Sequence, residues 1–295
     1  MATRMAIGMD IGGTNLRAAI VDSTGALTGF IQQPTANGSS DALHAQIVAV
    51  LAQFPRDLPT GIAIAGLIDA HGSVQASPNL SQLDFPLPLA RHLAHALGRS
   101  VVVGNDASYA AVAEQHFGVG VGASSLVMVA IGTGIGVGVV LNGTLLTGAH
   151  GFAGEFGHTV LNALTTATDV RAETLETYLS GTGIAQRAKR PSEAVVALAD
   201  AGDVAALALL KEVGQVLGVA LANVVNLLDV AVCVIGGGAG VGLYPHICQP
   251  ITDALGTHVL GGQTGRELPP VKRAQLGDTA GVIGAAVMAA DRVRP

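Results

Sequence analysis

Short, continuous apolar segments alternate along the chain with longer segments in which apolar residues recur every three or four positions. Continuous apolar runs are typical of buried strands, and the 3–4 spacing is typical of helices. Strands are predicted within residues 5–31 (three strands joined by tight turns), 61–69, 100–103, 127–141 and 230–235. Helices are predicted over 41–53 with Asp41 as N-cap, near 87–97, over 204–228 and near 279–291. This alternation predicts an α/β fold.

The first turn of interest follows the apolar strand that begins at Ala6. Asp10 lies near the end of this strand, and Gly12, Gly13, Thr14 and Asn15 follow it. Glycines allow backbone N–H groups to come close to an anion, and the carboxylate of Asp10 could hold a metal ion. The pattern therefore favours a phosphate and metal site. An ordinary β-hairpin whose glycines only supply positive φ remains an equal alternative from this stretch alone.

A second copy of this pattern favours the phosphate site over an ordinary hairpin. Gly132, Thr133 and Gly134 also stand between two apolar strands, and Gly132 lies 120 positions after Gly12. A duplicated strand–turn–strand unit predicts two similar lobes that face one cleft, each binding part of a nucleotide's phosphates.

Four positions in the first half of the chain are candidates for ligand contact. Gly66 interrupts the run 61–69, where a ligand could approach the backbone closely. Asn79 lies in a proline-containing loop, which on its own reads as a turn. Asn105 and Asp106 follow the strand 100–103, at a sheet edge where α/β proteins bind ligands. From the residues alone, capping of the next helix is the more common role for Asp106.

Further candidates lie in the second half. Glu155 and His158 stand three apart in a glycine-rich loop and suit a hydroxyl-rich ligand, whereas a zinc site at His158 lacks neighbouring ligands. Glu176 opens a helical segment, and a solvated first-turn acid is its alternative reading. Gly236, Gly237 and Gly238 follow a buried strand, where a base or ribose could lie on bare backbone, or where a helix simply begins. Residues 160–175 are polar and receive no assignment.

Composition narrows the functional classes. The chain has 295 residues, of which 49% are hydrophobic and 12% charged, so the composition excludes a disordered chain. With 40 glycines and 3% aromatic residues, the core must consist of small aliphatic side chains. A net charge of −6 argues against a nucleic-acid-binding face. The two cysteines, Cys233 and Cys248, are too few for a disulfide framework or a cysteine-based zinc site.

A mean hydropathy of +0.52 raises the question of a membrane span. Glycines, Asn223, Asn226 and Asp229 interrupt the longest apolar stretches, so no uninterrupted span of about 20 residues remains. No basic segment followed by an apolar one opens the chain. We therefore expect a cytoplasmic protein without a membrane partner.

Taken in order, these motifs resemble the ROK family (repressors, open reading frames and sugar kinases) of the actin-like ATPase superfamily. Asp10–Thr14 and Ile131–Gly134 resemble its two phosphate motifs, and Gly236–Gly238 resembles its adenosine motif. Other matching segments are Asn105–Ala107, Glu155–His158, Leu175–Gly181 and Ala280–Ala286, and the spacing from Ile131 through Gly148 to His158 follows the ROK signature. The resemblance covers nearly the whole chain.

The resemblance implies a two-lobed actin-like ATPase (ribonuclease H-like) fold, with duplicated mixed sheets flanked by helices. The small N-terminal lobe would comprise residues 1–109 plus 279–295, and the large C-terminal lobe residues 110–278.

The resemblance also implies an activity, the ATP-dependent phosphorylation of a hexose hydroxyl, with glucose to glucose 6-phosphate as the first expectation. Asp106 would be the general base, and Asp10 would hold Mg²⁺ directly or through water. Nucleotide-binding residues would be Asp10, Gly12, Gly13, Thr14, Asn15, Gly132, Thr133, Gly134, Gly236, Gly237 and Gly238. Sugar-binding residues would be Gly66, Asn79, Asn105, Asp106, Glu155, His158 and Glu176.

One departure from the family pattern is informative. Most ROK kinases carry a Cys-x-Cys-x4-Cys zinc cluster between the positions of His158 and Glu176, and this interval contains no cysteine here. We therefore predict no zinc, and the conformation that aims both side chains at the sugar is left open.

Several alternatives stay open. The sugar could be N-acetylmannosamine or N-acetylglucosamine, the donor could be polyphosphate, and the protein could bind sugar without catalysis. A repressor is disfavoured, because the phosphate motif begins at Asp10 and no basic cluster replaces a DNA-binding domain. The family resemblance also favours a homodimer.

Overall fold

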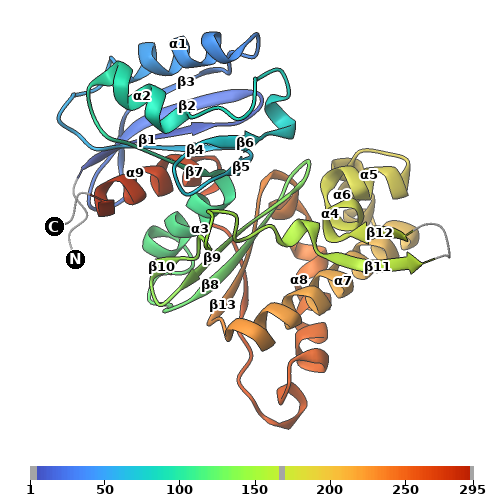
Figure 1. Cartoon of the computed structure of the whole chain (residues 1–295). Coiled ribbons are helices and arrows are strands. Elements are labelled where there is room, and N and C mark those ends of the chain that lie inside the picture. Colours follow the sequence, from blue (N-terminus) through green and yellow to red (C-terminus); the bar gives the residue numbers. More distant parts are fainter. Residues whose placement is uncertain (1–4, 166–169, 293–295) are drawn as a thin grey trace. The chain divides into compact units, whose positions relative to one another are not determined.

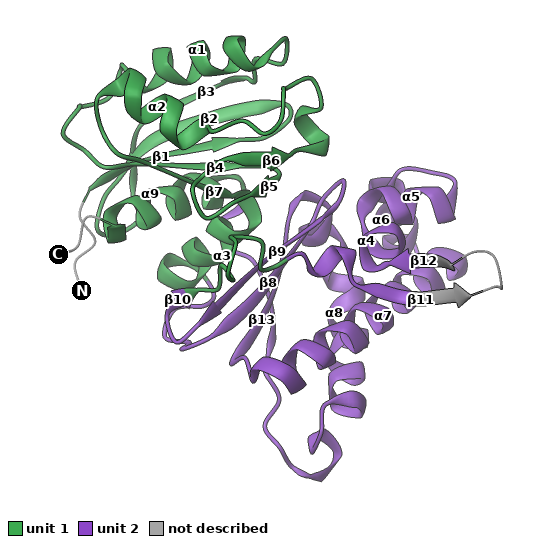
Figure 2. Ribbon diagram, viewed as in Figure 1, with its two compact units in different colours: residues 1–118, 145–154, 278–295 green, residues 119–144, 155–277 purple. Residues whose placement is uncertain are grey.

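The computed structural model describes residues 5–165 and 170–292. The chain divides into two compact units, coloured separately in Figure 2. Unit 1 comprises residues 1–118, 145–154 and 278–295, and unit 2 comprises residues 119–144 and 155–277. The lobe boundary expected at residue 109 falls inside helix α3 (Asp106–Phe117), all of which belongs to unit 1.

Unit 1 is built on a five-stranded mixed sheet of order β3-β2-β1-β4-β7 (Figure 1). Its strands are β1 (Ala6–Ile11), β2 (Asn15–Val21), β3 (Leu27–Pro34), β4 (Thr60–Ile64) and β7 (Val101–Asn105). The first three form an antiparallel meander, as the sequence predicts, and β1, β4 and β7 run parallel. A small hairpin of β5 (Leu67–Ile68) and β6 (Val74–Ala76) follows β4, and a 3-10 turn, η1 (Pro78–Leu80), follows the hairpin.

Helices cover both faces of this sheet (Figure 1). They are α1 (Ser40–Leu51), α2 (Leu89–Leu97), α3 and α9 (Ala280–Arg292). The sheet packs closely on α9, because a Cβ added at Gly8 or Gly61 would lie within 2 Å of a carbonyl oxygen of that helix. The N-cap of α1 is Ser39, whose side chain accepts the N–H of Ala42 at 3.1 Å, so the prediction of Asp41 was wrong and Asp41 lies in the first turn instead.

Unit 2 repeats this plan. Its sheet has the order β10-β9-β8-β13-β14, with β8 (Leu126–Ile131), β9 (Ile135–Leu141), β10 (Thr144–Leu145), β13 (Val232–Gly236) and β14 (Val271–Arg273). As in unit 1, the central strand pairs antiparallel with the next strand of the chain on one side and parallel with a later strand on the other. The predicted duplication of mixed sheets in an α/β fold is confirmed.

The helices of unit 2 are α4 (Leu175–Leu179), α5 (Gly181–Ala188), α6 (Ser192–Asp200), α7 (Val204–Leu228) and α8 (Gly238–His258), with 3-10 turns η2 (Phe156–His158) and η3 (Gly262–Thr264). A further 3-10 turn, η4 (Gly277–Thr279), begins at the last residue of unit 2 and continues into unit 1. The predicted bounds of α7 are confirmed. The unassigned stretch after residue 160 contains two antiparallel strands, β11 (Val160–Thr165) and β12 (Val170–Thr174).

Among the described residues, α7 is the one helix long and apolar enough to cross a membrane by length and composition, a test that core helices also pass. It packs on α8 at close range, since a Cβ at Gly214 or Gly218 would lie 2.8 Å from a carbonyl oxygen of α8.

Candidate active site

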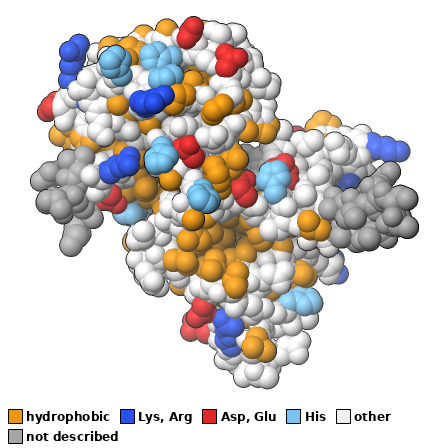
Figure 3. Space-filling model, viewed as in Figure 1, with side chains coloured by type: hydrophobic (Ala, Val, Ile, Leu, Met, Phe, Trp, Pro, Cys, Tyr) orange, Lys and Arg blue, Asp and Glu red, His pale blue; other side chains and the backbone are white. Residues whose placement is uncertain are grey.

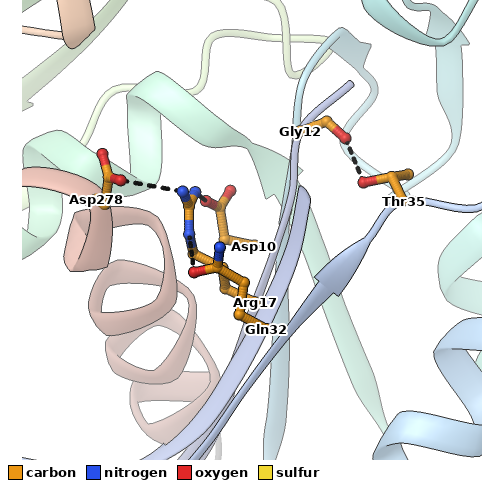
Figure 4. Close-up of polar contacts among 6 residues, drawn as sticks. All are labelled: Asp10, Gly12, Arg17, Gln32, Thr35 and Asp278. Atoms are coloured by element: carbon orange, nitrogen blue, oxygen red, sulfur yellow. Dashed lines mark hydrogen bonds and ion pairs between the residues drawn. The ribbon is translucent and has the colours of Figure 1, made fainter. Parts of the chain in front are cut away.

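The turn between β1 and β2, Gly12–Thr14, is called turn 1. The N–H of Gly12 donates to the Asn15 carbonyl at 3.0 Å, which closes the turn. The Thr35 hydroxyl donates to the Gly12 carbonyl at 2.7 Å (Figure 4). The Thr35 N–H donates to the Thr14 carbonyl at 2.9 Å. Thr35 therefore fixes the orientation of two peptide groups of this turn.

Asp10 lies directly opposite Arg17 in the β1–β2 ladder. Figure 4 shows the Arg17 guanidinium between two carboxylates, with Nη1 3.8 Å from Asp10 Oδ2 and Nη2 3.0 Å from Asp278 Oδ2. The Nε of Arg17 donates to Gln32 at 3.3 Å. On its other side, the Asp10 carboxyl touches the first turn of α9, where a Cβ at Gly281 would lie 2.7 Å from Cγ of Asp10.

Two carboxyl groups of unit 1 have raised pKa values. Burial, the negative charge of Asp106 and that of Asp278 raise the pKa of Asp10 to about 7, although Arg17 opposes the shift. Burial also raises the pKa of Asp106, against the N–H of Ala107, which donates to Asp106 Oδ1 at 2.9 Å and lowers it. Crowded carboxyl groups of this kind suit the binding of a cation or the transfer of a proton.

Asn105, and not Asp106, caps α3. Its Oδ1 accepts the N–H of Ser108 at 2.9 Å, while its Nδ2 donates to the Gly66 carbonyl at 3.0 Å. The alternative role of Asp106 as the N-cap is therefore wrong, because Asp106 is the first residue of the helix.

Two other predicted positions in unit 1 have structural neighbours. Gly66 adopts φ +141°, and a Cβ there would lie 2.4 Å from the Ala76 carbonyl oxygen, so the β5–β6 hairpin requires this glycine without any ligand. Asn79 is exposed in η1, and its backbone oxygen would lie 2.8 Å from a Cβ at Gly13. Asn79 thus lies beside turn 1.

The turn between β8 and β9, Gly132–Gly134, is called turn 2. The N–H of Gly132 donates to the Gly134 carbonyl at 2.9 Å, which closes the turn. The N–H of Gly181 donates to the Gly132 carbonyl, and the Thr182 hydroxyl donates to the Thr133 carbonyl, both at 2.8 Å. As in turn 1, donors from elsewhere in the unit hold two of the turn's carbonyl groups.

The carboxylate of Glu176 also contacts turn 2. Its Oε2 accepts the N–H of Ile135, the first residue of β9, at 2.8 Å. A Cβ at Gly134 would lie 2.4 Å from the same oxygen, so only glycine leaves room for the carboxylate.

Glu155 and His158 form a separate pair in and beside η2. Both side chains are exposed, and Nε2 of His158 lies 3.9 Å from Oε2 of Glu155. The backbone of η2 packs on β9, because a Cβ at Gly157 would lie 2.8 Å from the Ile135 carbonyl oxygen.

The glycines at the start of α8 divide into two kinds. Gly237 has φ +79°, and a Cβ there would lie 2.4 Å from the Ile131 carbonyl oxygen, so the fold itself requires this glycine. A Cβ at Gly238 would meet no atom within 4 Å, and the same holds at Gly132 in turn 2. At these two positions the described structure gives no packing reason for glycine, and a ligand could approach the backbone.

The structure thus groups the predicted residues within each unit. In unit 1 it groups turn 1 with Asn79, Asn105 with Gly66, and Asp10 with the charge of Asp106. In unit 2 it groups Glu176 with turn 2, and Glu155 with His158. Sequence reasoning missed Arg17, Thr35, Thr182 and Asp278, although the register of a tight hairpin would have placed Arg17 opposite Asp10.

Other features lie outside these groups. A cavity of about 640 Å³ between α1 and α2 is lined by none of the predicted site residues; its lining includes Asp41, His44, Asp84, Arg91, His92 and His95. No three or more His, Cys, Asp or Glu side chains within residues 5–161 and 173–292 are arranged to hold a metal ion. On the face drawn in Figure 3, Lys and Arg side chains are scattered singly and form no basic patch among the described residues.

Comparison with known proteins matches this chain to one family. The sequence model of the ROK family matches residues 6–292. The bifunctional enzyme NanE/NanK of Brucella suis biovar 1 is 34% identical over 292 residues, covering 96% of this chain and 53% of that enzyme, so the chain spans about half the length of this relative. N-acetyl-D-glucosamine kinase of Escherichia coli O157:H7 is 30% identical over 305 residues, covering 96% of this chain and 99% of that enzyme.

Solved structures agree with the sequence comparison. The ROK hexokinase from Thermus thermophilus superposes with a TM-score of 0.82 at 30% identity, covering 98% of this chain and 99% of that chain. The ROK family glucokinase from Streptomyces griseus, solved in complex with glucose and AMPPNP, gives a TM-score of 0.78 at 29% identity, covering 97% of this chain and 99% of that one. Both match the two mixed sheets flanked by helices described above.

Proposed function

The chain belongs to the ROK family, and from that premise we propose that it transfers the γ-phosphoryl group of ATP to a hydroxyl group of a hexose. N-acetyl-D-glucosamine kinase of Escherichia coli O157:H7, a sugar kinase, is matched over 99% of its length. The observation that carries the proposal is the pair of crowded carboxyl groups, Asp10 and Asp106, at the strand ends of unit 1. Asn105 already caps α3, so the Asp106 carboxylate is available for chemistry.

Asp106 is the proposed general base. It accepts the proton of the attacking sugar hydroxyl as the oxygen bonds to the γ-phosphorus and the bond to the β–γ bridging oxygen breaks. A base works best when its pKa lies near the working pH, and burial raises the pKa of Asp106 in that direction.

Asp10 is the proposed magnesium residue. Magnesium is usually held by one or two carboxylates together with substrate phosphates. The carboxylate of Asp10, beside Arg17, fits that requirement. The negative charges of Asp106 and Asp278, which raise the pKa of Asp10 to about 7, would be offset by a cation there. When bound, Mg²⁺ neutralises charge on the phosphates.

The two turns and the start of α8 are the proposed nucleotide-binding segments. Glycine at 132 and 238 leaves open space where a phosphate or ribose can reach the backbone. The comparison with the glucokinase solved with AMPPNP supports ATP as the donor. We keep Gly12, Gly13, Thr14, Asn15, Gly132, Thr133, Gly134, Gly236, Gly237 and Gly238 as the proposed contacts, of which Gly237 is also required by the fold.

The proposed sugar contacts are Gly66, Asn79, Asn105, Asp106, Glu155, His158 and Glu176. Carboxylate, amide and imidazole groups suit the donors and acceptors of a sugar's hydroxyls. Glucose is the first candidate substrate, with glucose 6-phosphate as product. N-acetylglucosamine and N-acetylmannosamine are the alternatives, and the match to N-acetyl-D-glucosamine kinase favours testing the first of them in parallel.

A coupled assay of ADP release tests this function. The purified chain is incubated with MgATP and, separately, with glucose, mannose, fructose, N-acetylglucosamine and N-acetylmannosamine, and then with polyphosphate in place of ATP. We expect ADP release that depends on one sugar, with a phosphorylated sugar identified by mass spectrometry. A folded sample that phosphorylates none of the sugars with either donor would overturn the proposal and favour sugar binding without catalysis.

Three further expectations accompany this function. We propose a cytoplasmic location, where ATP is supplied, a homodimer, and no requirement for zinc. Sedimentation tests the dimer, and activity that survives a zinc-selective chelator with Mg²⁺ in excess tests the last expectation.

A further inference from the structure

The segment Leu175–Thr182, in which α4 ends and α5 begins, is called the elbow. Three of its residues contact turn 2 through consecutive peptide groups. Gly181 and Thr182 donate to the carbonyls of Gly132 and Thr133, and Glu176 accepts the N–H of Ile135. The elbow therefore holds turn 2 from Gly132 to the first residue of β9.

We propose that the elbow is a positioning device for the nucleotide's phosphates, and that Glu176 acts on turn 2 as well as on the sugar. This inference rests on the proposed function, because it assumes that turn 2 binds phosphates. By this inference, Glu176 contributes to nucleotide affinity in addition to its proposed contact with the sugar.

The carboxylate of Glu176 fits closely against turn 2. A hydrogen bond from an N–H to an ionised carboxylate is stronger than one between neutral groups. The space for the carboxylate exists only because residue 134 is glycine, since a Cβ would lie 2.4 Å from Oε2 of Glu176. The carboxylate and the glycine thus complement each other across 42 positions of sequence (176 minus 134).

The elbow is itself anchored to a long helix. The hydroxyl of Tyr178 donates to Oε1 of Glu212 in α7, and Nη2 of Arg187 in α5 donates to the same oxygen at 2.7 Å. The Arg187 guanidinium also lies 4.0 Å from the centroid of the Tyr178 ring. Ser180 caps α5 by accepting the N–H of Gly183 at 3.0 Å. These contacts tie both helices of the elbow to each other and to α7.

Turn 1 is held by the same kinds of hydrogen bond as turn 2. There, one residue, Thr35, supplies both an N–H and a hydroxyl to the turn's carbonyls. In turn 2, the same two kinds of donor come from Gly181 and Thr182. Holding carbonyl groups fixes the direction of the peptide planes, and so the direction in which their N–H groups point.

The test measures nucleotide affinity in the absence of sugar, by calorimetric titration of AMPPNP with Mg²⁺. Thr182→Val removes only the hydroxyl, and we expect AMPPNP to bind about 2- to 10-fold more weakly. Glu176→Ala removes a charge-assisted contact, and we expect a loss of about 10-fold or more. The Michaelis constant for sugar should stay near wild type in Thr182→Val and rise in Glu176→Ala.

Two matched variants serve as controls. Thr182→Ser keeps the hydroxyl and should restore wild-type AMPPNP affinity. His158→Asn alters a proposed sugar residue outside the elbow and should change only the sugar's Michaelis constant. Unfolding temperatures of all variants verify that each is folded.

The outcomes separate the two proposals. If wild type phosphorylates a sugar but Thr182→Val and Glu176→Ala both bind AMPPNP as wild type does, the elbow does not position turn 2. If wild type neither binds AMPPNP nor phosphorylates any sugar, the proposed function fails, and this inference fails with it.

Discussion

Turn 1 and turn 2 occupy the same place in two sheets of the same strand order, yet their surroundings differ. Both consist of three residues between the central strand and its antiparallel partner. Beside turn 1, the ladder pairs Asp10 with Arg17, whereas beside turn 2 the corresponding pair is Ala130 with Gly136. Unit 1 therefore has charged groups next to its turn, and unit 2 has none at these positions.

The source of the supporting hydrogen bonds also differs. Thr35 follows β3 and belongs to the local meander of unit 1, whereas the elbow reaches turn 2 from helices distant in sequence. The comparison indicates that the duplicated frame provides two similar turns, and that later segments add different chemistry to each. In this account, unit 1 supplies the proposed general base Asp106 and magnesium residue Asp10, and unit 2 supplies the more open glycines.

Asp106→Asn is expected to have the largest effect on turnover. Asparagine keeps the shape but cannot accept the hydroxyl proton, so kcat should fall about 10²- to 10⁴-fold. Sugar affinity, measured by titration, should change little. Turnover close to wild type would contradict the placement of the catalytic base in unit 1.

Gly237→Ala separates a glycine required by the fold from one available to a ligand. A Cβ at this position lies 2.4 Å from the Ile131 carbonyl oxygen, and φ is +79°. We expect the free energy of unfolding to fall by about 2 kcal/mol or more. Gly238→Ala, where a Cβ meets open space, should unfold like wild type in urea but bind nucleotide more weakly. Equal unfolding midpoints for the two variants would contradict this distinction.

Asp10 should make stability depend on pH. Its native pKa of about 7 exceeds the ordinary 3.8, so the native state holds this proton more tightly than the unfolded chain. Its contribution to stability is therefore greatest below pH 3.8, declines as pH rises to about 7, and is constant above that.

Asp10→Asn removes this titration. Relative to wild type, the variant should gain about 2–4 kcal/mol in free energy of unfolding between pH 4 and pH 8, measured in urea without Mg²⁺. The same variant should lose magnesium-dependent turnover. A stability difference that does not change with pH would contradict the raised pKa.

The neighbours of Asp10 should shift its titration in opposite directions. Arg17 lowers the pKa of Asp10 and Asp278 raises it. The pH at which kcat/KM for MgATP falls on the acid side should therefore move up in Arg17→Met and down in Asp278→Asn. The second shift is the smaller, because the Asp278 side chain is 84% exposed. Shifts in the same direction would show that neither residue acts through Asp10.

The sequence predicted most of the fold, and the reason is visible in particular elements. The bounds of α7 followed from its long 3–4 spacing, and the three strands of the first meander followed from short apolar runs between turns. The two strands after residue 160 were not predicted, because threonine-rich polar segments lack a hydrophobic period. Ser39 and Asp41 are both good capping residues, and sequence alone could not decide which one caps α1.

The local motifs of the candidate site could be predicted from the sequence, whereas most contacts between its residues could not. Turn 1, turn 2 and the acid at 106 all follow strands, where local patterns are strong. The contact of Glu176 with Ile135 joins residues 41 positions apart, and the bonds from Thr182 and Thr35 come from residues without a local signal. Such contacts depend on how elements separated in the sequence pack together, which no short sequence window contains.

The most direct test of the account is nucleotide binding by Gly12→Ala and Gly132→Ala. The nearest atom to a Cβ at Gly12 is the Asn15 carbonyl oxygen at 3.6 Å, and a Cβ at Gly132 meets nothing within 4 Å, so both variants should fold. If both turns approach the phosphates of MgATP, each methyl group should weaken AMPPNP binding about 10-fold or more, with an unchanged unfolding temperature. Wild-type AMPPNP affinity in both folded variants would contradict the claim that these turns bind the nucleotide.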